Sequence, residues 1–224
     1  MQDETKRVAA RRSMEFIEDG MRLGIGSGTT VRYVIEMLGE RVRDGLKVIG
    51  VPTSAASAEL AAHHGIELAT FEEIQELDLA IDGADEIGPR LSLIKGGGGA
   101  LLHEKIVASA AKRFLIVVGE GKVVEKLGRF PLPVEVVPFA AALVQKRLSA
   151  MGGSPQLRPG PEGANYLTDE GNWILDCPFG LIEDPHQLAR EIRAIVGVVE
   201  HGLFLDMATE AVVADAQGVS LLSR

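Results

Sequence analysis

Hydrophobic residues in the first half of the chain recur with two alternating spacings. Val31, Val34, Ile35 and Leu38 lie at i, i+3, i+4 and i+7, which predicts an amphipathic helix. Further helices are predicted at residues 4–19, 55–64 and 101–113, and short apolar strands at 21–25, 47–51, 66–68, 79–82, 91–94 and 114–118. Strands that alternate with helices predict an α/β fold, with a mostly parallel sheet covered by helices on both faces.

The character of the chain changes after residue 128. Pro131, Pro133 and Pro138 cluster there, which is typical of a domain crossing. The segment that follows contains helices predicted near 139–150 and 185–195, a Gly/Pro-rich loop and a hairpin around 169–172, and strands return at 198–205, 211–214 and 219–222. We expect one α/β domain made of residues 1–128 and 198–224, and a smaller α+β domain of residues 129–197.

Composition narrows the class of protein. The chain has 224 residues, 46% of them hydrophobic, and a formal charge of -9 from 23 Lys and Arg against 32 Asp and Glu. An acidic protein with an ordinary apolar content is folded and lacks the basic surface that nucleic-acid binding needs. Cys177 is the single cysteine, the N-terminal residues are charged, and no stretch approaches the ~20 apolar residues of a membrane span. We expect a cytoplasmic protein without membrane or nucleic-acid partners.

A glycine-rich segment, residues 24–30, follows a predicted strand and opens the next helix. Backbone N–H groups in such a loop favour an anion such as phosphate, and so do the hydroxyls of Ser27, Thr29 and Thr30. The segment is neither a Walker loop nor a dinucleotide fingerprint, because no Gly-Lys-Ser/Thr follows and Thr29 stands where a glycine belongs. A tight turn with Thr29 as the helix N-cap is an equally good interpretation of this segment alone.

Residues 82–86 place three carboxylates at and just beyond the end of the strand predicted at 79–82. Open α/β sheets bind ligands at the carboxyl ends of their strands. Crowded carboxylates raise one another's pKa unless a cation or ligand hydroxyls relieve them. We therefore expect this segment to contact a ligand. A solvated turn and a divalent-ion site made of oxygen ligands alone are the alternatives.

Four consecutive glycines, residues 96–99, lie between Lys95 and a predicted helix. Ordering a glycine costs about 0.5–1 kcal/mol relative to alanine, so this run indicates close approach of the backbone to a ligand. Lys95 supplies a cation beside the run, and Glu104 lies in the first turn of the helix that follows. Taken alone, Glu104 is explained by a favourable interaction with the helix dipole, and Lys122 by a position on the surface.

Together these segments closely resemble ribose 5-phosphate isomerases of the A type, over nearly the whole chain. The resemblance rests on residues 24–30, 82–87, 95–98, 104–106, 130–136 and 171–176. It implies interconversion of ribose 5-phosphate and ribulose 5-phosphate in the pentose phosphate pathway, without a metal or an organic cofactor. It also implies a Rossmann-like α/β domain, a smaller α/β domain, and assembly as a homodimer or homotetramer.

The resemblance assigns roles to individual residues. It implies that Glu104 is the proton acceptor, and with the chemistry of the reaction it makes Asp82 and Lys95 the other catalytic candidates. The implied substrate-binding residues are Ser27, Gly28, Thr29, Thr30, Asp82, Gly83, Ala84, Asp85, Lys95, Gly96, Gly97, Gly98 and Lys122. The family often carries Asp-x-Ser-Lys where this chain has Gly119-Glu120-Gly121-Lys122, so the role of Lys122 rests on the lysine alone.

Two other classes of protein stay open. A non-catalytic phosphosugar sensor would need the phosphate loop but not Glu104. An acyl-CoA-type transferase can share glycine loops and a glutamate nucleophile. Incubation with ribose 5-phosphate alone distinguishes the three, because an isomerase forms a ketose without any second substrate.

Overall fold

The computed structural model describes residues 2–224 and divides them into two compact units. The first unit takes in the chain up to Ala84, His103–Val123 and Asp206–Arg224. The second takes in Asp85–Leu102 and Val124–Leu205.

A seven-stranded sheet forms the centre of the first unit, in the order β14-β13-β7-β4-β1-β2-β3. Neighbouring strands pair in parallel, apart from the antiparallel hairpin of β13 and β14. The strands are β1 (Arg22–Ile25), β2 (Ile49–Pro52), β3 (Glu67–Leu68), β4 (Leu77–Asp82), β7 (Ala111–Val118), β13 (Glu210–Asp215) and β14 (Gly218–Ser223). The mostly parallel sheet predicted from the sequence is confirmed.

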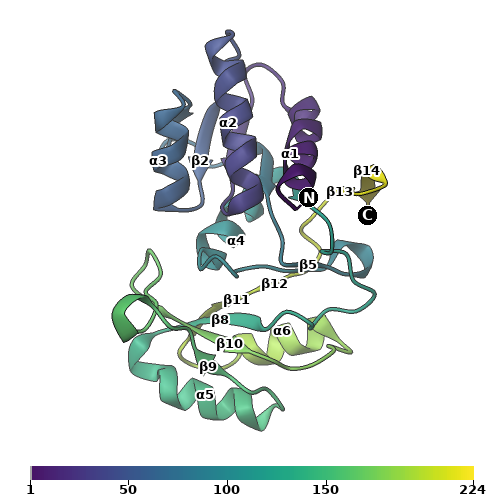
Figure 1. Cartoon of the computed structure of the whole chain (residues 1–224). Coiled ribbons are helices and arrows are strands. Elements are labelled where there is room, and N and C mark those ends of the chain that lie inside the picture. Colours follow the sequence, from purple (N-terminus) through teal and green to yellow (C-terminus); the bar gives the residue numbers. More distant parts are fainter. Residues whose placement is uncertain (1) are drawn as a thin grey trace. The chain divides into compact units, whose positions relative to one another are not determined.

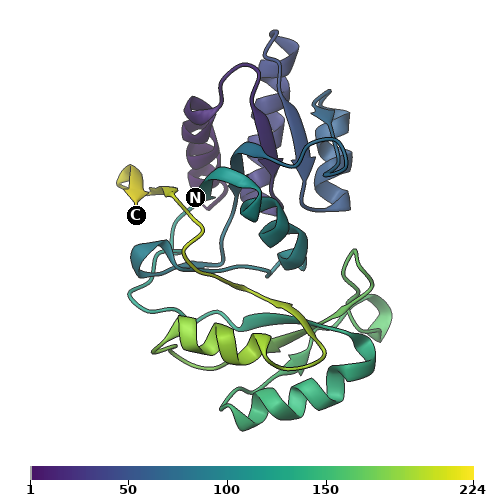
Figure 2. The ribbon, with the colours of Figure 1, turned by 180° about the vertical axis from the view of Figure 1, so that it is seen from behind.

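Helices cover both faces of this sheet (Figures 1 and 2). One face carries α1 (Gln2–Ser13), α2 (Thr29–Arg43) and α3 (Ala55–His63), and the other carries α4 (Leu101–Ser109). Successive residues of β1 point to opposite faces of the sheet, so the strand packs against helices on both faces. Leu23 and Ile25 join the core with Val31 of α2, whereas a Cβ added at Gly24 would lie 2.5 Å from Cγ1 of Val107 in α4.

The second unit is a small α+β structure, as the sequence predicted. Its antiparallel sheet has the order β11-β8-β10-β9, with α5 and α6 packed on it through Val134, Val144 and Ile192. A three-stranded sheet of β12, β6 and β5 completes it. The bounds are β5 (Glu86–Ile87), β6 (Leu93–Ile94), β8 (Leu132–Val136), α5 (Ala141–Ala150), β9 (Gln156–Leu157), β10 (Trp173–Cys177), α6 (Pro185–Arg193), β11 (Val198–His201) and β12 (Leu203–Phe204). Short 3-10 helices lie at Met14–Phe16, Pro89–Leu91, Pro138–Ala140 and Pro161–Gly163.

The structure differs from the sequence-based expectation in two respects. The domain bounds are the first: residues 85–102, 124–128 and 198–205 were expected with the larger domain but lie in the second unit. There β5 and β6 pair with each other, β12 pairs with β6, and β11 pairs with β8. The helix predicted for 101–113 ends at Ser109, because the chain from Ala111 onward pairs with both β4 and β13. The hydrogen bonds of a central strand outweigh the local helical pattern there.

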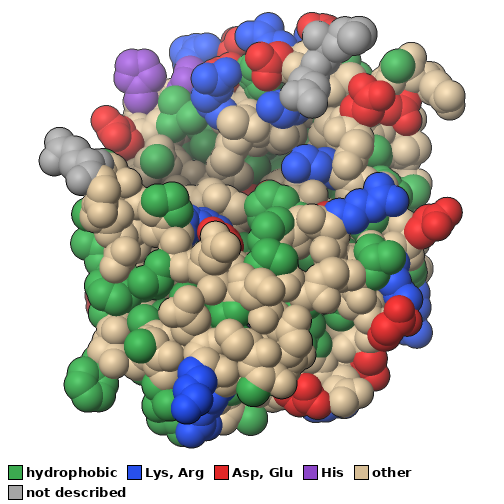
Figure 3. All heavy atoms as spheres, turned by 60° about the horizontal axis from the view of Figure 1, so that its bottom comes forward, with side chains coloured by type: hydrophobic (Ala, Val, Ile, Leu, Met, Phe, Trp, Pro, Cys, Tyr) green, Lys and Arg blue, Asp and Glu red, His purple; other side chains and the backbone are tan. Residues whose placement is uncertain are grey.

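The surface and the helices also bear on the class of protein. No helix among residues 2–224 is long and apolar enough to cross a membrane. Figure 3 shows one face of the molecule, on which basic side chains (blue) lie in separate small groups among acidic and hydrophobic ones. The described side chains of that face therefore form no broad basic area, in keeping with the formal charge of -9.

Candidate active site

The predicted site residues belong to both units. The first unit contains Ser27, Gly28, Thr29, Thr30, Asp82, Gly83, Ala84, Glu104 and Lys122. The second contains Asp85, Lys95, Gly96, Gly97 and Gly98. Each group is described within its own unit.

The order of the strands brings two of the predicted loops together. Strands β2 and β3 follow β1 on one side of it, and β4 and β7 lie on the other, so the direction of the chain across the sheet switches between β1 and β4. At such a switch point a crevice opens at the carboxyl ends of the strands, and α/β proteins bind ligands there. Residues 26–28 connect β1 to the start of α2, and residues 83–84 directly follow β4.

Asp82 links these two loops. Its Oδ1 accepts hydrogen bonds from the backbone N–H of Ser27 at 3.0 Å and of Gly83 at 2.7 Å. The side chain is buried at the end of β4. A Cβ added at Gly26 would lie 2.3 Å from Cγ of Asp82, so only glycine allows β1 to approach the carboxylate this closely.

The loop after β1 ends in the N-terminus of α2. The N-cap of this helix is Gly28, with φ at +92° and no capping side chain, so the interpretation of Thr29 as the N-cap is wrong. Thr29 is the first helical residue and is exposed, as Gly28 is, while Ser27 and Thr30 are half-buried. The first N–H groups of a helix lack partners within the helix, which suits an anion at this end.

Three further hydroxyl groups surround Ser27, and the sequence analysis missed them. Oγ of Ser27 shares a hydrogen bond of 2.6 Å with Oγ1 of Thr53 and donates one of 3.1 Å to Oγ of Ser54. Ser54 caps α3, and Ser57 donates to the carbonyl oxygen of Gly26 at 2.7 Å. Hydroxyl residues directly after the strand predicted at 47–51 were the available signal, because that strand ends at the same edge of the sheet.

Glu104 and Asp82 lie on the same side of the sheet in the first unit. A Cβ added at Gly24 would touch both Val107 of α4 and Ala80 of β4, so these two residues face each other. Asp82 follows Ala80 by two residues along a strand, and Glu104 precedes Val107 by three along a helix, which keeps each on the same face of its element. Both carboxylates are buried, with exposed fractions of 2% for Asp82 and 5% for Glu104.

Lys122 follows β7 and is half-buried. The start of α1 lies against the same loop, since a Cβ added at Gly119 would be 2.9 Å from Oγ1 of Thr5 and 3.2 Å from Cγ of Lys6. A second lysine therefore approaches this loop. The sequence analysis gave Lys6 no role, because a charged residue near the start of an amphipathic helix carries no distinguishing signal.

In the second unit, Lys95 and Asp85 adjoin the glycine run. The Lys95 side chain is buried, and its Nζ lies 5.4 Å from the centroid of the Phe204 ring. Its backbone N–H donates to the carbonyl oxygen of Gly202 at 2.9 Å. Oδ2 of Asp85 accepts a hydrogen bond of 2.8 Å from the N–H of Gly97. The aspartate segment and the glycine run, predicted separately, thus meet here.

Two side chains that the sequence analysis did not single out hold the carbonyl groups of the glycine run. Nη1 of Arg158 donates to the carbonyl oxygens of Gly96 at 2.9 Å and Gly97 at 3.1 Å. The Tyr166 hydroxyl donates to the carbonyl oxygen of Gly98 at 3.3 Å. Burial raises the pKa of Tyr166 above its usual range, so the phenol keeps its proton and remains a donor.

Glu86, the third carboxylate of the acidic segment, has a different environment from the two aspartates. It is buried and accepts hydrogen bonds from the backbone N–H groups of Gly128 at 2.7 Å and Phe130 at 2.6 Å. These bonds tie β5 to the segment before β8, which is a structural role. Among the side chains that the structure describes, no three His, Cys, Asp or Glu are grouped so that they could hold a metal ion.

Comparison with known proteins identifies the family of this chain. The family model for ribose 5-phosphate isomerase A (phosphoriboisomerase A) matches residues 49–218. A ribose-5-phosphate isomerase A of Nitrobacter hamburgensis is 51% identical over 228 residues, covering 99% of this chain and 98% of that protein. A solved D-ribose-5-phosphate isomerase in complex with phospho-erythronic acid matches with a TM-score of 0.98 at 39% identity over 100% of both chains. Ribose 5-phosphate isomerase A of Methanocaldococcus jannaschii matches with a TM-score of 0.94 at 41% identity over 99% of both chains. The chain therefore belongs to the ribose 5-phosphate isomerase A family, a family of isomerases.

Proposed function

We propose that this protein interconverts D-ribose 5-phosphate and D-ribulose 5-phosphate. The observation that carries the proposal is the 51% identity to a ribose-5-phosphate isomerase A over 99% of the chain. The solved relative with phospho-erythronic acid adds support, because its ligand is also a phosphorylated sugar derivative. Membership of this family favours an isomerase over the sensor and the acyl-CoA-type transferase.

The reaction moves a carbonyl group from C1 to C2. The proton on C2 is removed and a proton is added to C1, while the proton of the C2 hydroxyl passes to O1, through an enediolate. Glu104 is the proposed base that takes the C2 proton and returns it to C1. Its burial and its place on the same side of the sheet as Asp82 support this role, and general-base catalysis contributes on the order of 10²–10⁴ in rate.

The remaining charged residues have complementary roles in this proposal. Lys95 and N–H groups of the glycine run stabilise the negative charge that develops on oxygen, where preorganised donors in a dry environment are most effective. Asp82 and Asp85 accept hydrogen bonds from sugar hydroxyls, and Asp82 also assists opening of the furanose ring. The burial of Lys95 and Asp82 supports a water-poor setting for both.

The phosphate is assigned to residues 27–30 and Lys122. The exposed N-terminus of α2, the hydroxyls around Ser27 and the half-buried position of Lys122 support this assignment. Gly28, Gly83, Ala84, Gly96, Gly97 and Gly98 contribute backbone contacts. The resemblance further supports a homodimer or homotetramer that acts in the pentose phosphate pathway without a metal or organic cofactor.

The direct test is incubation of the purified protein with ribose 5-phosphate alone, in the presence of a chelator. We expect the ketose to appear and to rise to a constant ratio with the aldose. Binding of the sugar phosphate without any ketose would indicate the sensor instead. Activity lost on chelation and restored by a divalent ion would return the acidic segment to the role of a metal site.

A further inference from the structure

We propose that Arg158, oriented by Asp176, is a positioning residue for isomerisation that fixes the peptide groups of the glycine run. The inference rests on the proposed function for its kinetic consequence, and on the contacts within the second unit for its structural part. Neither residue was among the predicted site residues. Asp176 ends one of the motifs that carry the family resemblance, residues 171–176, but the proposed reaction gave it no role.

All three nitrogens of the Arg158 guanidinium are engaged. Nε and Nη2 donate to the two carboxylate oxygens of Asp176, at 2.9 Å and 2.6 Å. Nη1 donates to the carbonyl oxygens of Gly96 and Gly97. The side chain is only 12% exposed. Because the guanidinium is a rigid plane and two of its nitrogens are fixed on a carboxylate, the direction of the third is determined.

This geometry sets the direction of the glycine peptides. In a trans peptide the C=O and the N–H point in opposite directions. The peptide between Gly96 and Gly97 is therefore held at both ends, with its carbonyl oxygen on Arg158 and its N–H on Oδ2 of Asp85. The next carbonyl oxygen, that of Gly97, also faces Arg158, which turns the N–H of Gly98 to the opposite side. An added Cβ at Gly98 would meet no described heavy atom within 4 Å, so this residue borders open space.

Tyr166 completes the support on the carbonyl side. Its hydroxyl donates to the carbonyl oxygen of Gly98, and its ring centroid lies 5.7 Å from Cζ of Arg158. Gly99 has φ at +89°, and a Cβ there would lie 2.2 Å from the Tyr166 oxygen. The phenol thus packs directly on the turn of the run, in which the N–H of Gly99 closes on the carbonyl oxygen of Gly96 at 3.0 Å.

The segment that carries Arg158 and Tyr166 is itself fastened to the sheet. The N–H of Arg158 donates to the carbonyl oxygen of Ile174 in β10 at 2.9 Å. Further along the segment, the Thr168 hydroxyl and the Asn172 amide donate to Oε1 of the buried Glu135, at 2.9 Å and 3.0 Å. Glu135 lies in β8 and in the motif at 130–136. The motifs at 130–136 and 171–176 take no direct part in the proposed reaction. In this proposal both of them hold in place the segment whose side chains contact the glycine run.

The consequence for the reaction is specific. N–H donors aimed at developing charge stabilise the transition state more than the bound substrate, so loosening them lowers kcat and leaves KM nearly unchanged. A loss of general stability would not produce this split in a protein that stays folded. The kinetic parameters can therefore separate positioning from a merely structural role.

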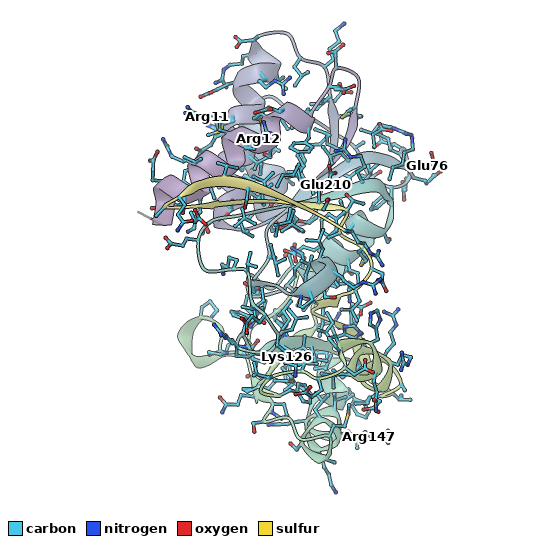
Figure 4. All side chains as sticks on the ribbon, turned by 90° about the vertical axis from the view of Figure 1, so that its right-hand side faces the viewer. Arg11, Arg12, Glu76, Lys126, Arg147 and Glu210 are labelled. Carbon is cyan, nitrogen blue, oxygen red and sulfur yellow. The ribbon has the colours of Figure 1, made fainter. Side chains whose placement is uncertain are left out.

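The test compares Arg158→Met and Arg158→Lys with Arg147→Met as a matched control. Arg147 belongs to the same unit and is exposed at the end of α5 (Figure 4). In both Arg158 variants we expect faster hydrogen–deuterium exchange in the peptide that covers residues 95–102, and a fall in kcat on the order of 10²-fold with KM within about 3-fold. Lysine keeps a positive charge beside Asp176 but lacks the planar guanidinium with its several N–H donors. We therefore expect Arg158→Lys to have a higher melting temperature than Arg158→Met but the same low kcat. The control leaves all three measurements unchanged.

Each result decides part of the proposal. Unchanged hydrogen–deuterium exchange at residues 95–102 in a folded Arg158 variant would overturn the proposal that Arg158 fixes these peptide groups. Faster exchange with wild-type kcat would overturn its role in the reaction. If Arg158→Met does not fold, Asp176→Asn supplies a milder release of the guanidinium, with the same expected outcomes. A wild-type protein that forms no ketose would overturn the proposed function and the kinetic claim together. The exchange measurement would still decide whether Arg158 fixes the peptide groups of the glycine run.

Discussion

The backbone N–H of Ser27 donates to Oδ1 of Asp82 over 3.0 Å, between residues that lie 55 positions apart in the chain. The bond joins the loop after β1 to the end of β4 at the point where the direction of the chain across the sheet switches. Asp82 therefore has a structural bond as well as a proposed part in the reaction. A substitution at this position is informative only if it separates the two.

The substitution Asp82→Asn separates the structural hydrogen bond of Asp82 from its proposed part in the reaction. Asparagine keeps an oxygen that can accept from Ser27 and Gly83, but it carries no negative charge for sugar hydroxyls or ring opening. We expect kcat/KM for ribose 5-phosphate to fall on the order of 10²-fold, with little change in the melting temperature. Asp215→Asn is the control, since Asp215 also accepts two backbone N–H bonds, in the exposed turn between β13 and β14. Wild-type kcat/KM in the Asp82 variant would leave its charge without a catalytic role.

Glu104→Gln tests the proton shuttle. Glutamine has nearly the same shape but cannot accept a proton, so turnover falls by about 10²–10⁴ while substrate still binds. Initial rates and calorimetric titration with ribose 5-phosphate measure the two quantities. Glu76→Gln, an exposed position visible in Figure 4, is expected to behave as the wild type. Near-normal turnover in a folded Glu104→Gln protein would remove Glu104 from the shuttle.

Lys122→Met tests the phosphate assignment. A charge-assisted hydrogen bond contributes about 1.5–3 kcal/mol, so its loss raises KM for ribose 5-phosphate at least about 10-fold, with kcat much less affected. Lys126→Met is the matched control, because Lys126, labelled in Figure 4, forms an ion pair with the exposed Glu183 and has no proposed part in the reaction. If both variants keep the wild-type KM, Lys122 is only a surface lysine.

Asp78 makes the stability depend on pH. Hydrogen bonds from the Arg22 side chain and backbone, with a further one from Lys112, hold the pKa of Asp78 well below its usual range. The pKa of Asp78 is lower in the folded protein than in the unfolded chain, where it is about 3.9. The ionised carboxylate therefore adds to the free energy of unfolding at pH values above about 3.9. This contribution decreases as the pH falls from there toward the folded-state pKa. Because the pair is partly exposed, we expect Asp78→Asn to cost about 1 kcal/mol at pH 7 and less at pH 3.

Urea unfolding at the two pH values measures the difference for Asp78→Asn. Asp44→Asn, at an exposed carboxylate, serves as the control and is expected to change little at either pH. A cost that is the same at pH 7 and pH 3 would show that the ionised carboxylate contributes nothing through Arg22.

Local sequence determined much of this protein. The helical spacing of four apolar residues was sufficient to predict α2, namely Val31, Val34, Ile35 and Leu38. Short apolar runs were likewise sufficient to predict the parallel strands. Both patterns are local, because backbone geometry imposes these periods within a few residues. Glycines directly after strands marked residues 27–30 as a candidate loop. The motifs identified the family, although they left the roles of Glu86, Glu135 and Asp176 unassigned.

Tertiary structure alone decided which of these segments meet. The placing of β1 beside β4 brings Ser27 to Asp82, and β2 brings Thr53 to Ser27. The contact of Arg158 with Gly96 spans 62 positions. Such contacts depend on strand pairing and side-chain packing across the whole chain, which no local pattern of polar and apolar residues encodes. For the same reason a crowded run of carboxylates was visible in the sequence, but the use of Glu86 as a backbone anchor became apparent only in the folded protein.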